Sequence, residues 1–109
     1  MNTLLPLVVK IEGNDRYQRL LDPASQTGGI KSGHVVLQPG EYVGRHSTSS
    51  REEVIVILRG KAQVFIQDKP FFFAEEKQIV YIPSNTDHDM MNAGDQLLEY
   101  IYVVAECRI

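Results

Sequence analysis

The sequence predicts a small all-β protein in which short antiparallel strands close into a barrel or a sandwich. Apolar and β-branched residues fall in short runs of strand length, and Gly, Pro, Asn and Asp separate these runs. No long stretch keeps apolar residues at the i, i+3, i+4 and i+7 spacing of an amphipathic helix. With 109 residues the chain has room for one hydrophobic core, so we expect residues 1–109 to form a single domain.

Each expected strand is a run rich in residues that fit a pleated sheet, and each run stops at residues that favour turns. We expect strands at residues 7–11, 17–21, 34–38, 53–58, 62–67, 71–73, 78–82, 88–92 and 97–105. The turns are expected at residues 28–29 (Gly-Gly), 39–40 (Pro-Gly), 59–61 (Arg-Gly-Lys), 68–70 (Asp-Lys-Pro), 83–85 (Pro-Ser-Asn) and 94–95 (Gly-Asp).

Two of these runs carry more apolar surface than one small barrel can cover. Residues 54–58 (Val-Ile-Val-Ile-Leu) are apolar at every position, so both faces of this strand should be buried. The three consecutive aromatics Phe71, Phe72 and Phe73 cannot all face one core, because successive side chains of a strand point to opposite faces. We therefore expect a homodimer.

Charge and composition exclude several classes of partner. The formal net charge is −3, and the basic residues are scattered, whereas binding to nucleic acid needs a basic face. The longest apolar runs are much shorter than the ~20 residues that cross a bilayer, so no membrane partner is expected. Cys107 is the single cysteine, and no secretory leader is recognisable, so a cytoplasmic location is expected. Cys107 lies near the C-terminus, where a half-exposed thiol is more common than a nucleophile or ligand.

The most specific signal is the spacing of a few residues between Gly40 and Gly60. His46, Thr48 and Glu53 stand between these two glycines at the intervals of the first cupin motif, which reads Gly, five residues, His-x-His, three or four residues, Glu, six residues, Gly. The segment therefore resembles that motif. Thr48 occupies the position of the second histidine.

A second group of residues, at positions 77–92, resembles the second cupin motif. Pro83, His88 and Asn92 match the pattern Gly, five residues, Pro-x-Gly, two residues, His, three residues, Asn. Lys77 and Asn85 stand where the family has glycines. Asn tolerates a positive φ, so Asn85 is expected to make its turn, whereas Lys77 weakens the match.

The resemblance implies a cupin barrel, which is a double-stranded β-helix of the jelly-roll type, with one divalent transition metal ion on His46, Glu53 and His88. The ion would be Fe, Mn, Zn, Ni or Cu. The chemistry of these side chains agrees, because two imidazoles and one carboxylate are a recurring set that leaves coordination positions open. Strand alternation places Glu53 on the inward face with Ile55 and Ile57. An unpaired carboxylate is costly to bury there, and a metal ion would offset that cost.

Several alternatives stand beside this interpretation. A register slip of one residue would turn Glu52 inward in place of Glu53. The alternative to a metal site is that His46, Glu53 and His88 are ordinary polar residues of solvated loops. His34 begins a strand outside both motifs, where a satisfied, half-buried histidine is the simpler expectation. Met90 and Met91 are expected to fill the core rather than bind metal. With Thr48 in place of imidazole, the site has three protein ligands or binds metal only weakly.

Three functions are compatible with these residues. The first is a metal-dependent enzyme of the dioxygenase, isomerase or decarboxylase type that acts on a small chelating molecule. The second is a non-catalytic module that binds or senses a small ligand. The third is a structural barrel with a degenerate site. Gln38, Tyr42 and Gln63 are candidate pocket residues, but none of them identifies a substrate.

Overall fold

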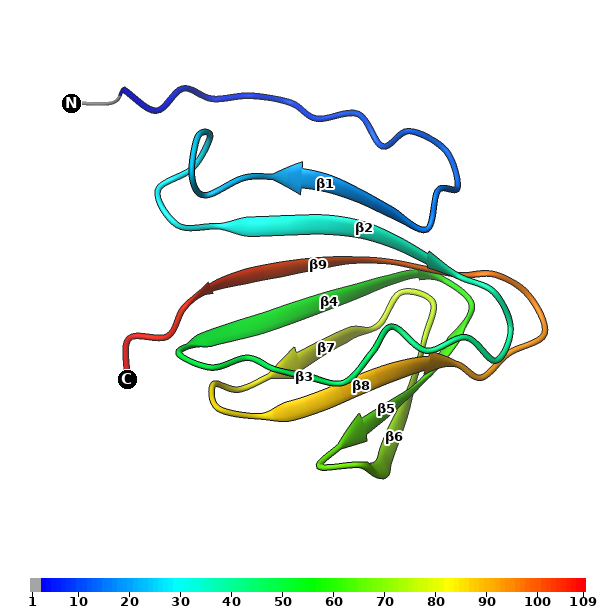
Figure 1. The fold of residues 1–109 in the computed structure, drawn as a ribbon. Helices are drawn as coiled ribbons and strands as arrows, with labels where there is room; N and C mark the ends of the chain where they lie inside the picture. The colour runs from blue at the N-terminus through cyan, green and yellow to red at the C-terminus, as the bar shows by residue number, and fades with distance from the viewer. Residues whose placement is uncertain (1–2) are drawn as a thin grey trace.

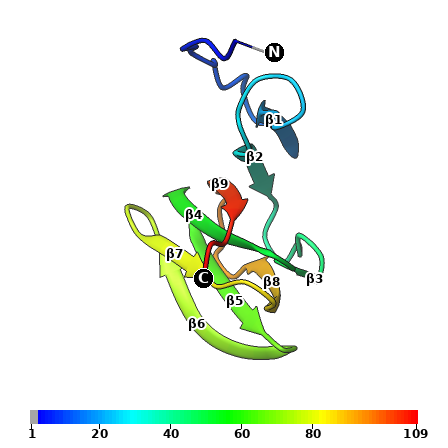
Figure 2. The same ribbon diagram turned by 90° about the vertical axis from the view of Figure 1, so that its left-hand side faces the viewer.

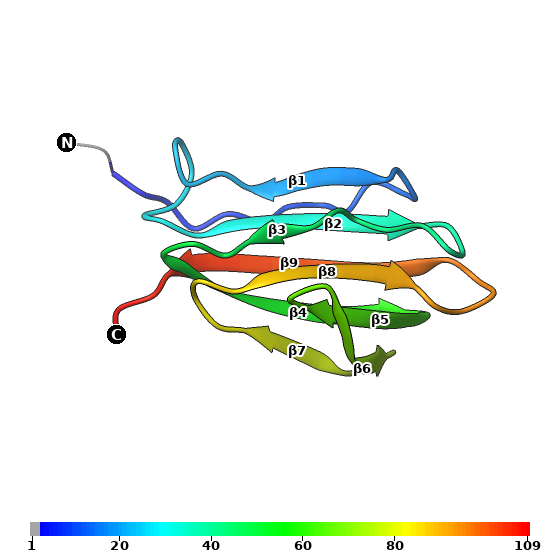
Figure 3. The same ribbon diagram turned by 60° about the horizontal axis from the view of Figure 1, so that its bottom comes forward.

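A computed structural model describes residues 3–109 and confirms the all-β prediction. A five-stranded sheet has the order β1-β2-β9-β4-β7, and a four-stranded sheet has the order β3-β8-β5-β6. The two sheets face each other as two layers, and their strands run along a common axis (Figures 1, 2 and 3). The strands are β1 (Tyr17–Leu21), β2 (Lys31–Leu37), β3 (His46–Ser47), β4 (Arg51–Arg59), β5 (Lys61–Ile66), β6 (Lys69–Glu75), β7 (Ile79–Ile82), β8 (Asp87–Asn92) and β9 (Leu98–Glu106). In the part of the chain that the structure describes, no helical segment has the length and hydropathy needed to span a bilayer.

The core lies between the two sheets, and strand alternation fills it. On β4, Glu53, Ile55 and Ile57 are buried, while the residues between them are only partly buried. This matches the expected register, so Glu53 rather than Glu52 faces inward. On β8 the alternation buries Met90 as core filler, and it directs His88 and Asn92 to the same interior.

The turn between β5 and β6 lies one residue earlier than expected. Gln67 and Asp68 form it, and both have positive φ angles, of 55° and 66°, as a two-residue hairpin turn requires. Pro70, which was expected in the turn, belongs to β6 instead. A proline is tolerated there because β6 is an edge strand that pairs with β5 alone, and the register shifts beside it.

The expected strand at residues 7–11 is wrong. This segment runs beside β1 without ladder pairing (Figure 1). The side chain of Gln18 holds it instead: its amide nitrogen donates to the carbonyl of Lys10 at 2.9 Å, and its amide oxygen accepts from the N–H of Glu12 at 2.7 Å. Val8 is 95% exposed, so the apolar pattern that suggested a strand does not reflect burial within this chain.

The outer face of the five-stranded sheet is apolar where β4 pairs with β7. Val54 lies opposite Tyr81 and Val56 lies opposite Ile79. Tyr81 is 54% exposed and Ile79 is 68% exposed. The aromatic residues Phe71, Phe72 and Phe73 of β6 are exposed as well. One chain therefore leaves uncovered the surface on which the homodimer prediction depends.

Candidate metal centre

The fold brings three side chains from two sheets together at one point between the layers. His46 on β3 lies directly opposite His88 on β8, and their ring centroids are 4.2 Å apart. Glu53 reaches them from β4 in the facing sheet, and its Oε1 lies 2.9 Å from Nε2 of His88. One ligand atom from each of the three residues lies within 4.8 Å of the other two. Residues up to 42 positions apart in the sequence thus converge on one point.

Backbone carbonyls orient both imidazoles. Nδ1 of His46 lies 2.8 Å from the carbonyl oxygen of Gly44, and Nδ1 of His88 lies 3.0 Å from that of Thr86. A carbonyl oxygen only accepts, so each Nδ1 carries the proton and donates it. Nε2 is then the atom with the free lone pair, and in His88 this atom points at the carboxylate of Glu53. The hydrogen bond from Nδ1 to the backbone carbonyl fixes the tautomer that a metal ligand needs, and the bond between Nε2 of His88 and Oε1 of Glu53 holds a shared proton when no ion is bound.

His88 and Glu53 are both buried, and they form a hydrogen-bonded pair. Their exposed fractions are 4% and 7%. Burial lowers the pKa of His88, but the hydrogen bond to Glu53, the carbonyl of Thr86 and the charge of Glu53 together outweigh burial and raise it above the ordinary value. A proton satisfies the pair when no ion is bound. A metal ion would satisfy the same two atoms by replacing that proton, so the donor set fits such an ion.

Thr48 lies at the site, but its hydroxyl serves the backbone. Its Oγ1 donates to the carbonyl of Pro83 at 2.7 Å and accepts from the N–H of Thr86 at 3.1 Å. Thr86 in turn holds Nδ1 of His88. Thr48 therefore ties the loop that follows His46 to the loop that precedes His88, a role that sequence reasoning missed.

The remaining motif positions have structural roles. Asn85 has a φ of 54°, as expected for its turn, and Lys77 also adopts a positive φ, of 69°. Lys77 thus takes the conformation for which the family pattern has glycine. Gly60 has a φ of 92°, and a Cβ there would lie 2.6 Å from the carbonyl oxygen of Leu97. The buried amide of Asn92 donates to the carbonyls of Leu37 and Gln96, and thereby closes one end of the barrel.

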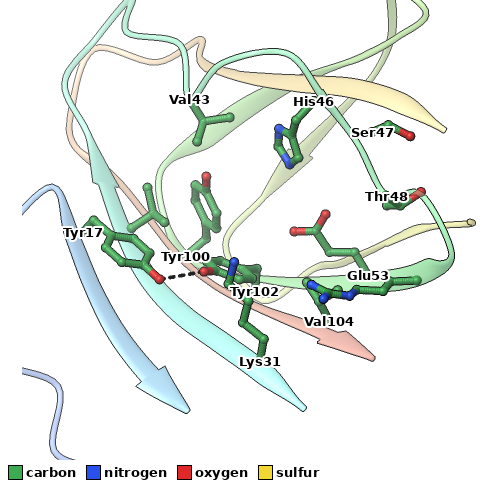
Figure 4. Close-up of a pocket in the computed structure, with 12 residues that line it drawn as sticks. Tyr17, Lys31, Val43, His46, Ser47, Thr48, Glu53, Tyr100, Tyr102 and Val104 are labelled. Carbon is green, nitrogen blue, oxygen red and sulfur yellow. Dashed lines mark hydrogen bonds between the residues drawn. The ribbon is translucent and has the colours of Figure 1, made fainter. Parts of the chain in front are cut away.

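A cavity of about 320 Å³ opens beside His46 and Glu53, which line it. In Figure 4 the carboxylate of Glu53 points toward the imidazole of His46, and Tyr17, Tyr100 and Tyr102 lie across the cavity from them. The hydroxyls of Tyr17 and Tyr102 are 2.8 Å apart. Much of the remaining lining is apolar, which is typical of small-molecule sites.

Two basic residues, Lys31 on β2 and Arg51 on β4, also line this cavity. Sequence reasoning missed both of them, together with the tyrosines. The only available signal was the period of two on the strands, which requires knowledge of which strands pair. None of the pocket residues suggested from the sequence, Gln38, Tyr42 and Gln63, lines the cavity.

The two residues that were expected to lie outside the site do lie outside it. His34 is 1% exposed and its Nε2 lies 2.7 Å from Oε2 of Glu99. Its neighbour across the strand pair is Ile101, on the face of β2 opposite to the cavity. Cys107 is partly exposed in the C-terminal segment, away from the three candidate ligands.

These features define a class of protein: a double-stranded β-helix with a His-Glu-His cluster inside one end of the barrel. A family model described as the cupin domain matches residues 33–104, and the chain belongs to this family. The fold and family expected from the two motifs are therefore confirmed.

Two known proteins show how far the likeness extends. The uncharacterized protein MJ0764 of Methanocaldococcus jannaschii is 26% identical over 91 residues, which cover 84% of this chain and 78% of that protein. Its crystal structure, described as an RmlC-like cupin family protein with a double-stranded β-helix fold, has a TM-score of 0.79 at 22% identity and covers 95% of this chain and 94% of that one. The crystal structure of a predicted oxalate decarboxylase of Thermotoga maritima has a TM-score of 0.75 at 22% identity, and the match covers 84% of this chain and 79% of that one.

One further relative is much longer. The alginate biosynthesis protein AlgA of Pseudomonas aeruginosa is 32% identical over 82 residues, which cover 75% of this chain. The chain spans only 17% of the length of AlgA. The likeness to AlgA therefore concerns one part of that protein.

Proposed function

We propose that this cupin binds one divalent transition metal ion on His46, Glu53 and His88 and uses it to hold a small chelating molecule in the adjoining cavity. The chemistry would be that of a metal-dependent dioxygenase, isomerase or decarboxylase. When bound, the ion would polarise the donor atoms of the chelating molecule or activate dioxygen.

One observation carries the proposal. Both imidazoles donate from Nδ1 to a backbone carbonyl, which leaves Nε2 of each ring available as a ligand atom. Nε2 of His88 lies 2.9 Å from Oε1 of Glu53, and one ligand atom of each of the three residues lies within 4.8 Å of the other two. A chance pair of histidines has no reason to share this orientation, whereas metal ligands are commonly oriented in this way. The burial of Glu53 and His88 supports the same conclusion, because a bound cation would compensate the buried carboxylate.

The open side of the site supports a role in binding a second molecule. His46 is exposed, and the cavity begins beside it. Three protein ligands leave up to three positions for water or a chelating molecule on an ion that prefers six-coordination. The oxalate decarboxylase prediction for the Thermotoga maritima protein is compatible with such a ligand, but at 22% identity that likeness extends to the fold alone.

A second candidate function, a non-catalytic module that binds a small ligand, is favoured by the composition of the cavity wall. Apart from His46 and Glu53, the residues that line the cavity include no carboxylate and no imidazole. Proton transfer at a bound substrate would therefore fall to Tyr17, Tyr102 or Lys31, or would not occur. NMR of metal-loaded protein mixed with small organic acids separates the two functions: turnover indicates the enzyme, and line broadening without turnover indicates the module.

Elemental analysis of protein purified without added metal tests the site itself. We expect about one transition metal ion per chain in the wild type and its loss in His46→Ala, Glu53→Ala and His88→Ala. The matched control is His34→Ala, which removes a buried histidine from the opposite face of β2 and should retain the ion. Equal loss in all four variants would mean that the ligand set is wrong.

A further inference from the structure

Two basic side chains lie within one small molecule's length of the candidate metal centre. Lys31 and Glu53 both lie opposite Val104, one on each side of it. Neighbouring strands are about 4.8 Å apart, so the α carbons of Lys31 and Glu53 are separated by about 10 Å across the sheet. Arg51 precedes Glu53 by two residues on the same face of β4, which is about 6.7 Å along the strand. Lys31, Arg51 and Glu53 all line the same cavity.

The charge of this cavity differs in sign from that of the whole chain. The chain has a net charge of −3, yet Glu53 is the one carboxylate among the residues that line the cavity, against Lys31 and Arg51. A nearby acid is Glu106, whose Oε1 lies 3.8 Å from Nε of Arg51. Both of those side chains are about half exposed or more, so this ion pair is weak. Among residues 3–109, no carboxylate forms a salt bridge with Lys31.

The positive charge beside the cavity helps to lower the pKa of Tyr17, one of the two paired tyrosines on the cavity wall. Burial opposes the ionisation of Tyr17, but the hydrogen bond with Tyr102 and the nearby charges of Arg19 and Lys31 outweigh burial and lower the pKa of Tyr17. Arg19 of β1 lies opposite Gly33 of β2, on the same face as Tyr17. Arg19 forms a salt bridge with Asp22 at 3.5 Å. The cavity thus combines basic side chains with hydroxyl donors, which is the chemistry that binds carboxylates.

We propose that the ligand of this cavity is a small organic acid with two acidic ends, one of which chelates the ion while the other binds Lys31 and Arg51. This inference rests on the proposed metal site. A divalent ion, the carboxylate of Glu53 and one chelating carboxylate together have no net charge. Lys31, Arg51 and Glu106 then leave one positive charge, which a second carboxylate on the ligand neutralises. Lys31 and Arg51 are specificity-determining residues in this arrangement.

Titration calorimetry on Ni²⁺-loaded protein tests the inference with ligand pairs that differ only in the second carboxylate. 2-Oxoglutarate is compared with 2-oxopentanoate, and malate is compared with 2-hydroxybutanoate, so that two chain lengths are covered. In the wild type we expect the dicarboxylate of at least one pair to bind about tenfold tighter or more, since tenfold corresponds to ~1.4 kcal/mol. In the double variant Lys31→Met/Arg51→Gln we expect this preference to disappear, while the affinity for the monocarboxylates stays within about twofold.

The control variant is Lys69→Met, which removes a charge from the exposed strand β6 and should keep the preference. Nickel content is measured for every variant before each titration. Wild-type protein that holds nickel but shows no preference in either pair overturns this inference and leaves the metal site standing. A preference that survives in the double variant also overturns it. Failure of the wild type to hold nickel overturns both the metal site and the inference.

Discussion

The hydroxyls of Tyr17 and Tyr102 lie 2.8 Å apart, and their rings stack with centroids 6.4 Å apart and an interplanar angle of 19°. The two residues are 85 positions apart in the sequence and belong to strands on opposite sides of β2. They meet because Gly33, between them on β2, has no side chain. A Cβ at Gly33 would lie 2.5 Å from Cε2 of Tyr102 and 2.7 Å from Cε1 of Tyr17.

Substitution of Gly33 by alanine should therefore separate the two tyrosines. We expect Gly33→Ala to lower the free energy of unfolding by about 1–3 kcal/mol, as overpacking in a closed interior does, and to weaken ligand binding in the cavity. Urea denaturation measures the first effect. The control is Gly94→Ala, because a Cβ at Gly94 would lie 3.5 Å or more from its neighbours, which is ordinary contact. Equal stability of the two variants would mean that the tyrosine rings move aside without cost.

Metal affinity should fall as the pH falls, and the fall should begin above the ordinary pKa of histidine, near 6.5. Burial lowers the pKa of His88, but its hydrogen bonds to Glu53 and Thr86 raise it overall, so the metal-free protein keeps this proton at a higher pH than an ordinary histidine does. An ion must displace that proton to bind, and each displaced proton costs about tenfold in affinity per pH unit below the pKa. Calorimetry in buffers of different ionisation enthalpy measures the proton release.

The stability of the metal-free protein should have the opposite pH dependence to metal affinity, and should fall as the pH rises. A raised pKa in the folded state means that the His88–Glu53 pair stabilises the fold below the unfolded pKa near 6.5, and this stabilisation is lost as the pH rises through the raised folded pKa. Bound metal should reverse the trend. Metal affinity that is constant from pH 8 to pH 5.5 would contradict the assignment of His88 as a ligand.

The hydroxyl of Thr48 should contribute to stability through the two loops that it joins. We expect Thr48→Val to lower the free energy of unfolding by about 1–3 kcal/mol, because the N–H of Thr86 and the carbonyl of Pro83 lose a buried partner. Metal affinity should fall as well, since Thr86 orients His88. Ser50→Ala is the control, because its hydroxyl makes an exposed bond to Glu106. A Thr48→Val protein as stable as Ser50→Ala would mean that the two loops hold their positions without the hydroxyl.

Replacement of Thr48 by histidine should instead lower the stability of the metal-free protein and raise its metal affinity. The variant loses the same two backbone bonds, so the metal-free protein should be less stable than the wild type. An added imidazole on the cavity wall should nevertheless tighten metal binding by about tenfold or more, and should leave two open positions where the wild type has three. Unchanged or weaker metal binding would show that a side chain at position 48 does not reach the ion.

The exposed apolar surface on β6 and β7 should mediate formation of a homodimer. Phe72, Phe73 and Ile79 line a shallow groove there, and Tyr81 extends the apolar surface across β7. We expect sedimentation at micromolar concentration to give a dimer for the wild type and a monomer for Ile79→Glu. Ile109→Glu, at the exposed C-terminal residue, places the same charge elsewhere and should leave the dimer intact. A monomeric wild type would contradict the prediction.

The parts of the site that could be predicted from the sequence are those fixed by spacing along one strand or loop. The clustering of His46, Glu53 and His88 could be predicted because the motif intervals reflect local geometry: Glu53 enters with the inward residues of β4, and Asn85 makes its turn before His88. Lys31 could not be found in this way. Its place across β9 from Glu53 depends on the register of β2 and β4 against β9, and nothing within any one strand indicates that register.

The errors in the fold have a related cause. Residues 7–11 have the composition of a strand, but no strand edge pairs with them, and the amide of Gln18 holds their backbone instead. Strand β3 was missed because it has only two residues, both polar, and it forms only because β8 lies alongside. Propensity describes a strand by itself, whereas pairing decides whether the strand exists.

The shortness of β3 has a kinetic consequence. His46 is exposed and lies on a two-residue edge strand, while Glu53 and His88 are fixed inside long paired strands. Short edge elements open locally at a much lower free energy than the whole protein unfolds. The candidate centre therefore has one candidate ligand on an element that frays easily and two on elements that are held more firmly. Exchange of a bound ion would proceed through that opening, at a rate set by the separation of β3 from β8 and largely independent of how stable the barrel is.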